Sequence, residues 1–555
     1  MIYRIPMILA CLGLLAGCNA ARTAREAAAG AITEQSYRGH VEKLASDEFE
    51  GRGLGSAGER KTVQYLEQQF LELGLQPVSG GSFRQEVPLV EITAMASASY
   101  LAFERGGRKL DLALGDDMVV GTRRVQPAVN VPASDVVFVG YGIVAPEYGW
   151  NDYAGLDMRG KTALILVNDP GFATRDPALF NGRAMTYYGR WSYKFEEAAR
   201  QGAAAAIIIH ETAPAAYPWQ VVRNSWTRPR FYAEPSDGNA RRCAIEGWVT
   251  QDRAREIFAL AGQDLGVLQE AAHRRGFVPV PLDLEASAGV RNAIRHATSP
   301  NVAAYLPGKE RPDEYVIYMA HWDHFGRLLA LSGDTIFNGA QDNATGVAAI
   351  LTIAQGFRAQ LSAPARSVVF VAVTAEESGL VGSEYYAAHP LVPLQKTAAV
   401  INVDSLYPLG RARDIQVIGF GASELEDRLA VAAARQKRVL SPDANPEAGH
   451  FYRSDHLNLA KKGVPSLYIK SGIDLIGQPP GTGQAMVDNY FANIYHKQVD
   501  DYQPTWDVSG SIEDLKLLFE VGASVAAEAS WPKWYEGNEF RAARDASAAA
   551  RSAAP

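Results

Sequence analysis

The chain has 555 residues and a formal net charge of −8, with 54 basic and 62 acidic side chains. Its sequence contains no basic run or patch, which argues against a nucleic-acid-binding protein. Apolar residues make up 47% and charged residues 21% of the chain, as in globular proteins, and this length predicts two or three domains.

The first eighteen residues predict a lipoprotein signal peptide. Arg4 precedes an apolar run from Ile5 to Leu15, which is shorter than the ~20 residues of a membrane-spanning helix. The Leu-Ala-Gly-Cys that ends this segment resembles a bacterial lipobox, in which Cys18 would carry the lipid. Because Asn19 is not the aspartate of inner-membrane retention, we expect a protein anchored in the outer membrane, facing the periplasm or the cell surface. A plain cleaved signal or a membrane anchor is the alternative.

The rest of the chain divides into four further parts by composition and periodicity. Residues 19–33 are Ala-rich and polar and predict a tether, and residues 536–555 predict a disordered tail. Residues 131–291 predict a separate β-rich module without a cluster of His, Cys or paired acids. Residues 34–130 and 292–535 predict a discontinuous main domain. Strands alternate with helices after Pro300, which predicts an α/β fold with a mostly parallel mixed sheet flanked by helices.

Several strands of this predicted sheet end in metal-binding residue types. The valine-rich strand Val368–Val373 leads into Glu376 and Glu377, two adjacent acids that repel each other unless a cation holds them. Further candidates follow other strands, precede a helix or lie in a late loop: His321, Asp323, Asp342, Asp404 and His496. Because strand ends meet at one edge of such a sheet, we expect these groups to cluster. Two histidines and three carboxylates suffice for two divalent ions that share one carboxylate.

The order His-x-Asp, Asp, Glu-Glu, Asp, His resembles the M28 family of co-catalytic zinc aminopeptidases. The matching segments are 320–323, 338–346, 374–383, 402–404 and 495–496. The resemblance covers roughly residues 38–125 and 295–530, which identifies the main domain as an M28 peptidase domain. Residues 131–291 resemble the protease-associated (PA) domain that is commonly inserted in these enzymes.

The resemblance implies a site for two Zn²⁺ per chain. His321 and Asp404 would be the terminal ligands of one zinc ion. Glu377 and His496 would hold the other, and Asp342 would bridge the two. The family often has a cis peptide bond after the bridging aspartate, here between Asp342 and Asn343.

Three further residues receive catalytic roles from the same resemblance. Glu376 would be the general base that takes a proton from water. Asp323 would orient His321 through a hydrogen bond. Tyr495 is a candidate to stabilise the oxyanion. His324, by contrast, is interpreted as an exposed residue or one that lies behind the ligands.

The predicted function is release of N-terminal residues from peptide substrates by a monomer whose only membrane contact is its lipid. One alternative is an M28 carboxypeptidase or an M20-like peptidase or deacylase. An M20-like enzyme would carry its extra domain after the third metal carboxylate, whereas the insertion here precedes His321. The other alternative is a non-catalytic binding protein built on the PA-like module.

Overall fold

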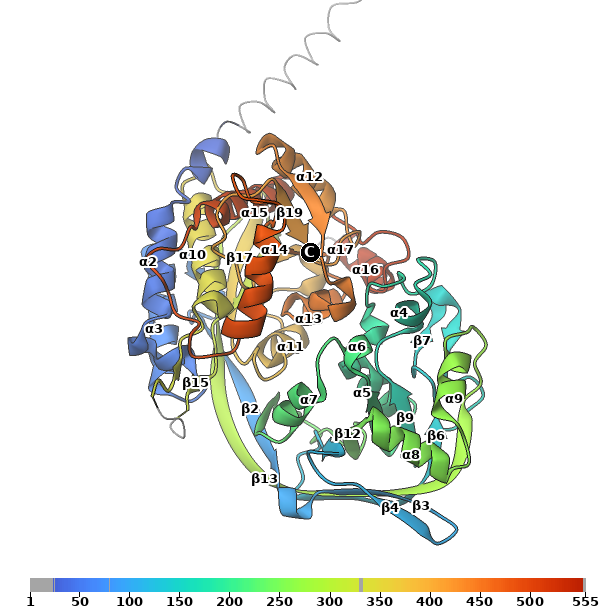
Figure 1. Cartoon of the computed structure of the whole chain (residues 1–555). Coiled ribbons are helices and arrows are strands. Elements are labelled where there is room, and N and C mark those ends of the chain that lie inside the picture. The colour runs from blue at the N-terminus through green and yellow to red at the C-terminus, as the bar shows by residue number, and fades with distance from the viewer. Residues whose placement is uncertain (1–22, 24, 79, 329–332, 553–555) are drawn as a thin grey trace, which may run out of the picture. The chain divides into compact units, whose positions relative to one another are not determined.

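The computed structural model describes residues 23, 25–78, 80–328 and 333–552 (Figure 1). The predicted signal peptide and Cys18 lie outside the described residues. The chain forms two compact units. Unit 1 combines the chain up to Val87 with Ser299–Asp443 and the residues from Ser454 onward, and unit 2 combines Pro88–Thr298 with Ala444–Arg453. No helix among the described residues is long and apolar enough to cross a membrane.

Unit 1 is built on a mixed, mostly parallel sheet, as predicted. Its central strands pair in parallel: β17 (Arg366–Val373), β14 (Arg311–His321), β18 (Thr397–Asn402) and β21 (Ser466–Lys470). The flanking strands are β1 (Gln76–Pro77), β13 (Val280–Leu306), β19 (Asp414–Val417) and β20 (Val439–Pro442). Of these, β13 runs antiparallel to β17. A small separate hairpin is formed by β15 (Gly326–Arg327) and β16 (Ile336–Phe337). All residues of β17 are buried, which explains its unbroken apolar run.

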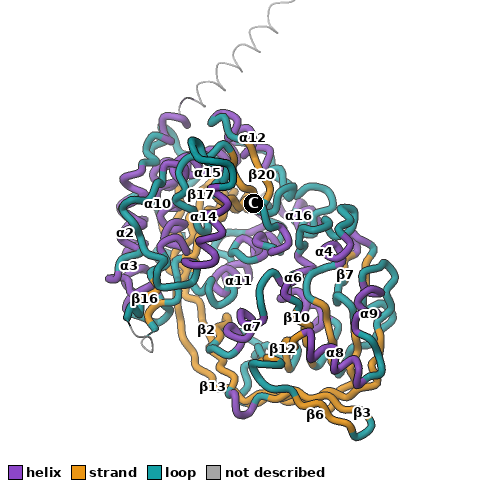
Figure 2. Tube along the Cα trace, in the orientation of Figure 1, coloured by secondary structure: helices purple, strands orange, loops and turns teal. Residues whose placement is uncertain are grey.

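Helices cover both faces of this sheet (Figure 2). Alternate residues of β17 point to opposite sides, so that Phe370 joins one core and Val371 the other. The first core is closed by α2 (Glu34–Leu44), α3 (Ala57–Glu72), α10 (Thr345–Arg358), α12 (Leu425–Arg435) and α15 (Ser509–Ala527). The second is closed by α11 (Val381–Ala388) and α13 (His456–Ala460), while α14 (Thr482–Asn489) precedes the late loop.

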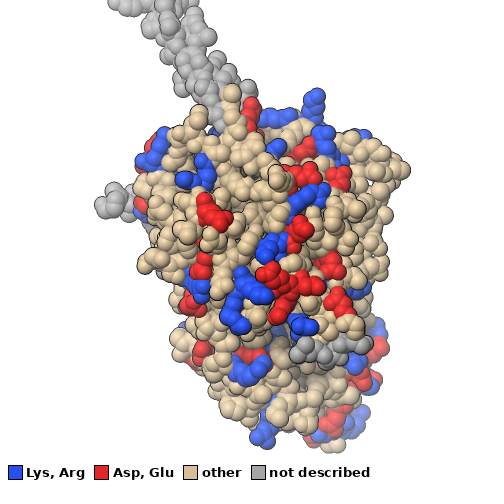
Figure 3. Space-filling view, turned by 90° about the vertical axis from the view of Figure 1, so that its left-hand side faces the viewer, with Lys and Arg blue, Asp and Glu red and all other residues tan. Residues whose placement is uncertain are grey.

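Helices α2 and α3 also form an outer face on which charges of both signs are interspersed (Figure 3). Arg38 pairs with Glu34 at 2.7 Å, and Lys43 pairs with Glu48 at 2.7 Å. Exposed pairs of this kind contribute little to stability. The described residues of this face present no extended field of one sign, in keeping with the absence of basic runs from the sequence.

A buried histidine of α2 makes the stability of unit 1 sensitive to acid. His40 is 7% exposed, its Nδ1 lies 2.6 Å from the hydroxyl of Tyr65, and burial lowers its pKa from 6.5 to about 4. The folded pKa is lower than the unfolded one, so neutral His40 stabilises the fold above pH 6.5, and this contribution is lost as the pH falls through 4. At pH 4.5 the loss is on the order of 2 kcal/mol. Between pH 7.5 and pH 4.5, the midpoint of unfolding should fall further in the wild type than in His40→Gln. An equal decrease in the two proteins would contradict the prediction.

The C-terminal segment is ordered in its described part, which differs from the predicted disorder of residues 536–555. It forms α16 (Arg541–Ala546) and α17 (Ala548–Ser552). The guanidinium of Arg544 is 1% exposed and donates hydrogen bonds to the backbone carbonyls of Thr397 and Ala398 at the start of β18. An Ala/Arg-rich composition suggests a solvated tail, but one buried arginine fixes it to the sheet.

Near the N-terminus, Ala28 and Ile32 are buried in the core of unit 1, so the predicted tether of residues 19–33 is partly core as well.

Unit 2 has its own parallel sheet, in the order β6 (Ala128–Phe138), β9 (Thr162–Leu166), β10 (Ala205–His210) and β12 (Ile245–Thr250). Around it run β2 (Arg84–Ala94), β3 (Tyr100–Arg105), β4 (Arg108–Asp111), β5 (Met118–Gly121), β7 (Val144–Ala145), β8 (Trp150–Asn151), β11 (Arg230–Ala233) and the first part of β13. The helices are α4 (Pro170–Thr174), α5 (Trp191–Arg200), α6 (Thr212–Ala215), α7 (Trp219–Trp226), α8 (Gln251–Leu260) and α9 (Leu265–Ala272).

The observed boundary of unit 2 differs from the predicted module of residues 131–291. The sequence pattern assigns the segment 88–130 to the main domain, but the strands of this segment pair within unit 2. β3 pairs with residues 285–289 of β13, and β5 pairs with β12. These partners are distant in sequence, so the periodicity of the segment did not reveal where it belongs.

Candidate active site

The carboxyl ends of the central strands of unit 1 bring the predicted residues together. His321 is the last residue of β14, Glu376 and Glu377 follow β17, and Asp404 follows β18. These strands are parallel neighbours, so their carboxyl ends lie at one edge of the sheet. Asp342 reaches the same place from the short turn Ala340–Ala344 that leads into α10. The peptide bond between Asp342 and Asn343 is cis, as expected.

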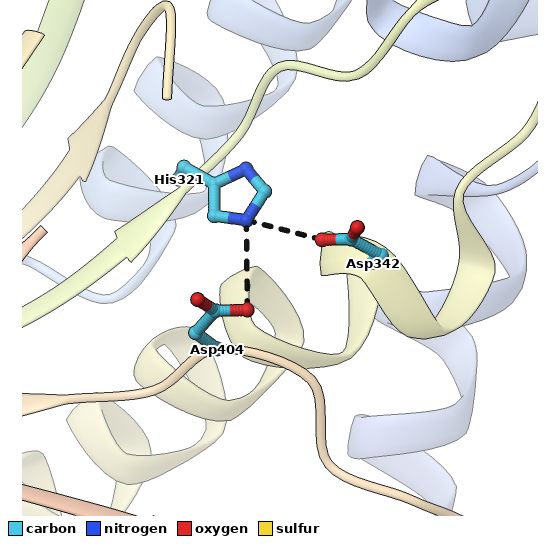
Figure 4. A group of neighbouring side chains, drawn as sticks. All are labelled: His321, Asp342 and Asp404. Atoms are coloured by element: carbon cyan, nitrogen blue, oxygen red, sulfur yellow. Dashed lines mark ion pairs between the residues drawn. The ribbon is translucent and has the colours of Figure 1, made fainter. Parts of the chain in front are cut away.

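Asp342 lies between two imidazoles. Its Oδ1 is 3.2 Å from Nε2 of His321, and its Oδ2 is 3.1 Å from Nε2 of His496. His321 Nε2 is also 3.7 Å from Oδ1 of Asp404, and Figure 4 shows both carboxylates directed at this nitrogen. On the other side, His496 Nε2 lies 3.3 Å from Oε2 of Glu377. One carboxylate therefore faces two separate His–acid pairs.

These separations fit ligands of metal ions. Zinc bonds of ~2.0–2.2 Å at a tetrahedral angle place two ligand atoms about 3.3 Å apart. The Nε2 atoms of His321 and His496 are buried and have no hydrogen-bond partner among the described residues. His321, Asp342 and Asp404 form one group whose ligand atoms all lie within 4.8 Å of one another. The five residues predicted as ligands thus converge with nitrogen and oxygen donors at spacings that suit divalent ions such as zinc.

Charges in the site shift one another strongly. Burial alone would raise the pKa of Asp342, but its contacts with His321 and His496 hold that pKa well below the usual range. The pKa of Asp404 falls to about 2, because Lys470 and His321 outweigh the effect of burial. Burial raises the pKa of Glu376 well above its ordinary value, with a contribution from the neighbouring charge of Glu377.

Residues 301–519 match the model of peptidase family M28. Over this segment, unit 1 is similar to M28 peptidases. The mouse aminopeptidase NAALADL1 is 35% identical over 137 residues, which cover 23% of this chain and 17% of that protein. A glutamate carboxypeptidase 2 homolog from Caenorhabditis elegans is 31% identical over 321 residues, which cover 49% of this chain and 37% of that protein. The chain therefore spans well under half the length of these curated relatives.

Among solved structures, an aminopeptidase from Aneurinibacillus sp. strain AM-1 has a TM-score of 0.48 and 19% identity, covering 91% of this chain and 97% of that one. A zinc aminopeptidase from Bacillus subtilis has a TM-score of 0.40 and 15% identity, covering 92% and 99%.

Asp323 contacts His321, as predicted, but its carboxylate has other partners. Its carboxylate lies 3.9 Å from Nδ1 of His321, too far for a hydrogen bond, whereas its backbone carbonyl is 3.2 Å away. The carboxylate instead accepts hydrogen bonds from the backbone N–H groups of Glu376, at 3.0 Å, and Glu377, at 3.4 Å. The backbone carbonyl of Asp323 therefore orients His321. The carboxylate of Asp323 orients the turn that carries Glu376 and Glu377.

Unit 1 also contains two supporting residues for which the sequence predicts no role. Arg52 is fully buried and donates hydrogen bonds to the carbonyls of Leu44, Trp322, Asn338 and Gly339. Asp500 is likewise fully buried, and its carboxylate accepts hydrogen bonds from the N–H groups of Gln341, at 3.0 Å, and Asp342, at 3.1 Å. Arg52 thus joins the loop after β14 to the turn that presents Asp342, and Asp500 fixes that turn. The segment around Arg52 resembles the family, but nothing in the local sequence marks Asp500.

Lys470 is a further residue missed from the sequence. It ends β21, donates a hydrogen bond to the backbone carbonyl of Asp404, and lies over the rings of Tyr407 and Tyr468, at 5.3 and 5.1 Å from their centroids. Its position at a strand end beside the other site strands is the signal that could have found it.

Tyr495 stacks directly on the neighbouring ligand. Its ring centroid is 3.6 Å from that of His496, with an interplanar angle of 24°. Burial raises the pKa of Tyr495 well above its usual range, so the hydroxyl keeps its proton as a hydrogen-bond donor. Tyr495 therefore lies beside the predicted ligands, where it fixes the plane of the His496 ring.

Proposed function

We propose that the chain is a metallo-aminopeptidase that binds two Zn²⁺ ions and hydrolyses the N-terminal bond of peptides. The observation that carries this proposal is the position of Asp342. Its two carboxylate oxygens face the Nε2 atoms of different histidines, at 3.2 and 3.1 Å, and each histidine has an acid of its own. A single metal would leave one of these imidazoles without a partner.

One ion would be held by His321 and Asp404, and the other by His496 and Glu377. Asp342 would contribute a ligand to each ion. Bound zinc supplies a Lewis acid that polarises a carbonyl group and makes water more acidic. Glu376 then takes the proton of the attacking water and passes it to the leaving amine. Tyr495 would donate a hydrogen bond to the oxygen that gains charge, in the same step.

A carboxypeptidase is the second candidate, because the C. elegans relative with the longer alignment is named a glutamate carboxypeptidase 2 homolog. The two activities differ in which end of the substrate must be free. An aminopeptidase acts on a free α-amino group, whereas a carboxypeptidase tolerates a blocked one.

Turnover of aminoacyl-p-nitroanilides, of unblocked peptides and of the same peptides with an acetylated N-terminus separates these activities. We expect zinc-loaded protein to release N-terminal residues and to be inactive on acetylated peptides, and metal analysis to find two zinc ions per chain. Release of C-terminal residues from acetylated peptides would favour the carboxypeptidase. Bound zinc without turnover of any peptide would favour a binding protein.

For the rest of the protein we propose the arrangement predicted from the sequence. The N-terminus is lipidated at Cys18 and holds a monomer in the outer membrane. Residues 131–291, within unit 2, are a PA domain inserted in the peptidase. Metabolic labelling with a fatty acid and the Cys18→Ser variant test the lipid, because only the wild type should take up the label.

A further inference from the structure

His324 contacts one of the predicted zinc ligands directly. It is 2% exposed, and its Nδ1 lies 2.5 Å from Oε1 of Glu377. The other oxygen of the same carboxylate, Oε2, faces His496 at 3.3 Å. The two oxygens of Glu377 therefore have different partners. Of the two predicted positions of His324, exposed or behind the ligands, the structure shows the second.

The imidazole of His324 is held in place by close packing. Gly339 has a φ of +54°, and a Cβ built there would lie 2.5 Å from Cδ2 of the ring. The ring of Phe325 lies against the imidazole with a centroid separation of 4.8 Å. Nε2 has no hydrogen-bond partner among the described residues, so the contact with Glu377 is the one polar contact found for this ring. The position of His324 is therefore set independently of Glu377.

Two roles are open to a histidine in this place. One of its ring nitrogens forms a group with oxygens of Asp342 and Glu377 within 4.8 Å, so it could bind the metal in place of His496. Two ligand atoms of one zinc ion, however, lie about 3.3–3.6 Å apart. The separation of 2.5 Å between Nδ1 of His324 and Oε1 of Glu377 is much too short for such a pair and marks a direct, short hydrogen bond between the two atoms.

We propose that His324 is a positioning residue that donates a hydrogen bond from Nδ1 to Oε1 of Glu377. One oxygen of Glu377 is then occupied by a protein donor, and Oε2 alone is presented to the metal beside His496. This inference rests on the proposed function only in that it requires zinc at the site. The inference predicts that Glu377 and His496 are already arranged to bind a metal ion before the ion binds.

The expected effect is on metal affinity. Loss of partners that orient a ligand commonly weakens binding 10–100-fold. Without His324, Oε1 loses its donor and the carboxylate turns freely, so we expect His324→Leu to bind its second zinc ion about 10–100-fold more weakly. The ion between His321 and Asp404 should bind as in the wild type. His324→Asn places an amide N–H near the position of Nδ1 and should restore most of the affinity, whereas His324→Gln should not.

The test is a titration of metal-free protein with zinc in competition with a chromophoric chelator. His40→Leu is the matched control, since it removes a buried histidine that is hydrogen-bonded to Tyr65 and not to a predicted ligand, and it should leave both affinities unchanged. Thermal unfolding of the metal-free proteins checks that each variant is folded. The Co²⁺ spectrum of the second site should change in His324→Leu and return toward wild type in His324→Asn.

Three results would overturn the inference. One is a folded His324→Leu protein that binds both zinc ions like wild type. Another is a His324→Asn protein as defective as His324→Leu. The third is complete loss of the second ion in His324→Leu while His496→Leu keeps it, which would make His324 the ligand. If the wild type itself binds no zinc, the proposed function fails too, and this outcome is distinct from the others.

Discussion

Replacing Glu376 by glutamine is expected to lower kcat by about 10²–10⁴-fold while the protein keeps its zinc. The substitution preserves the size of the side chain and removes its ability to accept a proton. None of the contacts that join His321, Asp342 and Asp404 involves Glu376. Steady-state kinetics on an aminoacyl-anilide together with metal analysis of the same sample measure both quantities.

Glu377→Gln is the matched control, since it alters the adjacent acid in the same way. It should lose zinc from the position beside His496, and activity should fall with the metal content. Retention of zinc in Glu377→Gln, or loss of zinc in Glu376→Gln, would reverse the two roles. Persistent turnover in zinc-loaded Glu376→Gln would remove Glu376 as the base.

Replacing Arg52 by methionine is expected to destabilise unit 1 by on the order of 4 kcal/mol or more. The guanidinium is the donor to four backbone carbonyls, and each buried acceptor left without a donor costs roughly 1–3 kcal/mol. Two of these carbonyls belong to Asn338 and Gly339, which lead into the turn of Asp342. Zinc affinity should therefore fall together with stability. Denaturant unfolding with and without zinc measures both effects.

Two variants make this result interpretable. Arg52→Lys keeps a buried cation with fewer donors and should lie between the wild type and Arg52→Met. Arg60→Met removes an exposed arginine eight positions further on, in α3, and should change stability little. An Arg52→Met protein as stable as Arg60→Met would show that the four hydrogen bonds contribute nothing measurable.

The five predicted ligands were accessible from the sequence for a simple physical reason. A buried parallel strand is a continuous apolar run, so the polar residues that follow it mark one edge of the sheet. His321, Glu377 and Asp404 all follow such runs. Asp342 and His496 lie outside the strands and were candidates by residue type alone, and the resemblance to M28 enzymes assigned their roles as ligands.

The supporting residues were not accessible in this way, because their partners are backbone groups far away in the chain. Arg52 binds carbonyls of residues 322, 338 and 339, and Asp500 binds N–H groups of residues 341 and 342. Periodicity describes which face of an element is buried and says nothing of such contacts. For Asp323, the sequence predicts a contact with His321, which the structure shows at the backbone carbonyl of Asp323. It does not reveal that the carboxylate accepts hydrogen bonds from the backbone after β17.

The discontinuity of unit 1 constrains the order in which this protein can fold. Helices α2 and α3 are made early, but their core partners α10 and α15 follow only after the whole segment 88–298. Domains generally fold as units during synthesis, N-terminal parts first. The two N-terminal helices must therefore remain unpartnered, with apolar faces such as that of Val63, Leu66 and Phe70 exposed, while most of unit 2 emerges. A chaperone that shields this segment on the ribosome would find its binding site in those helices.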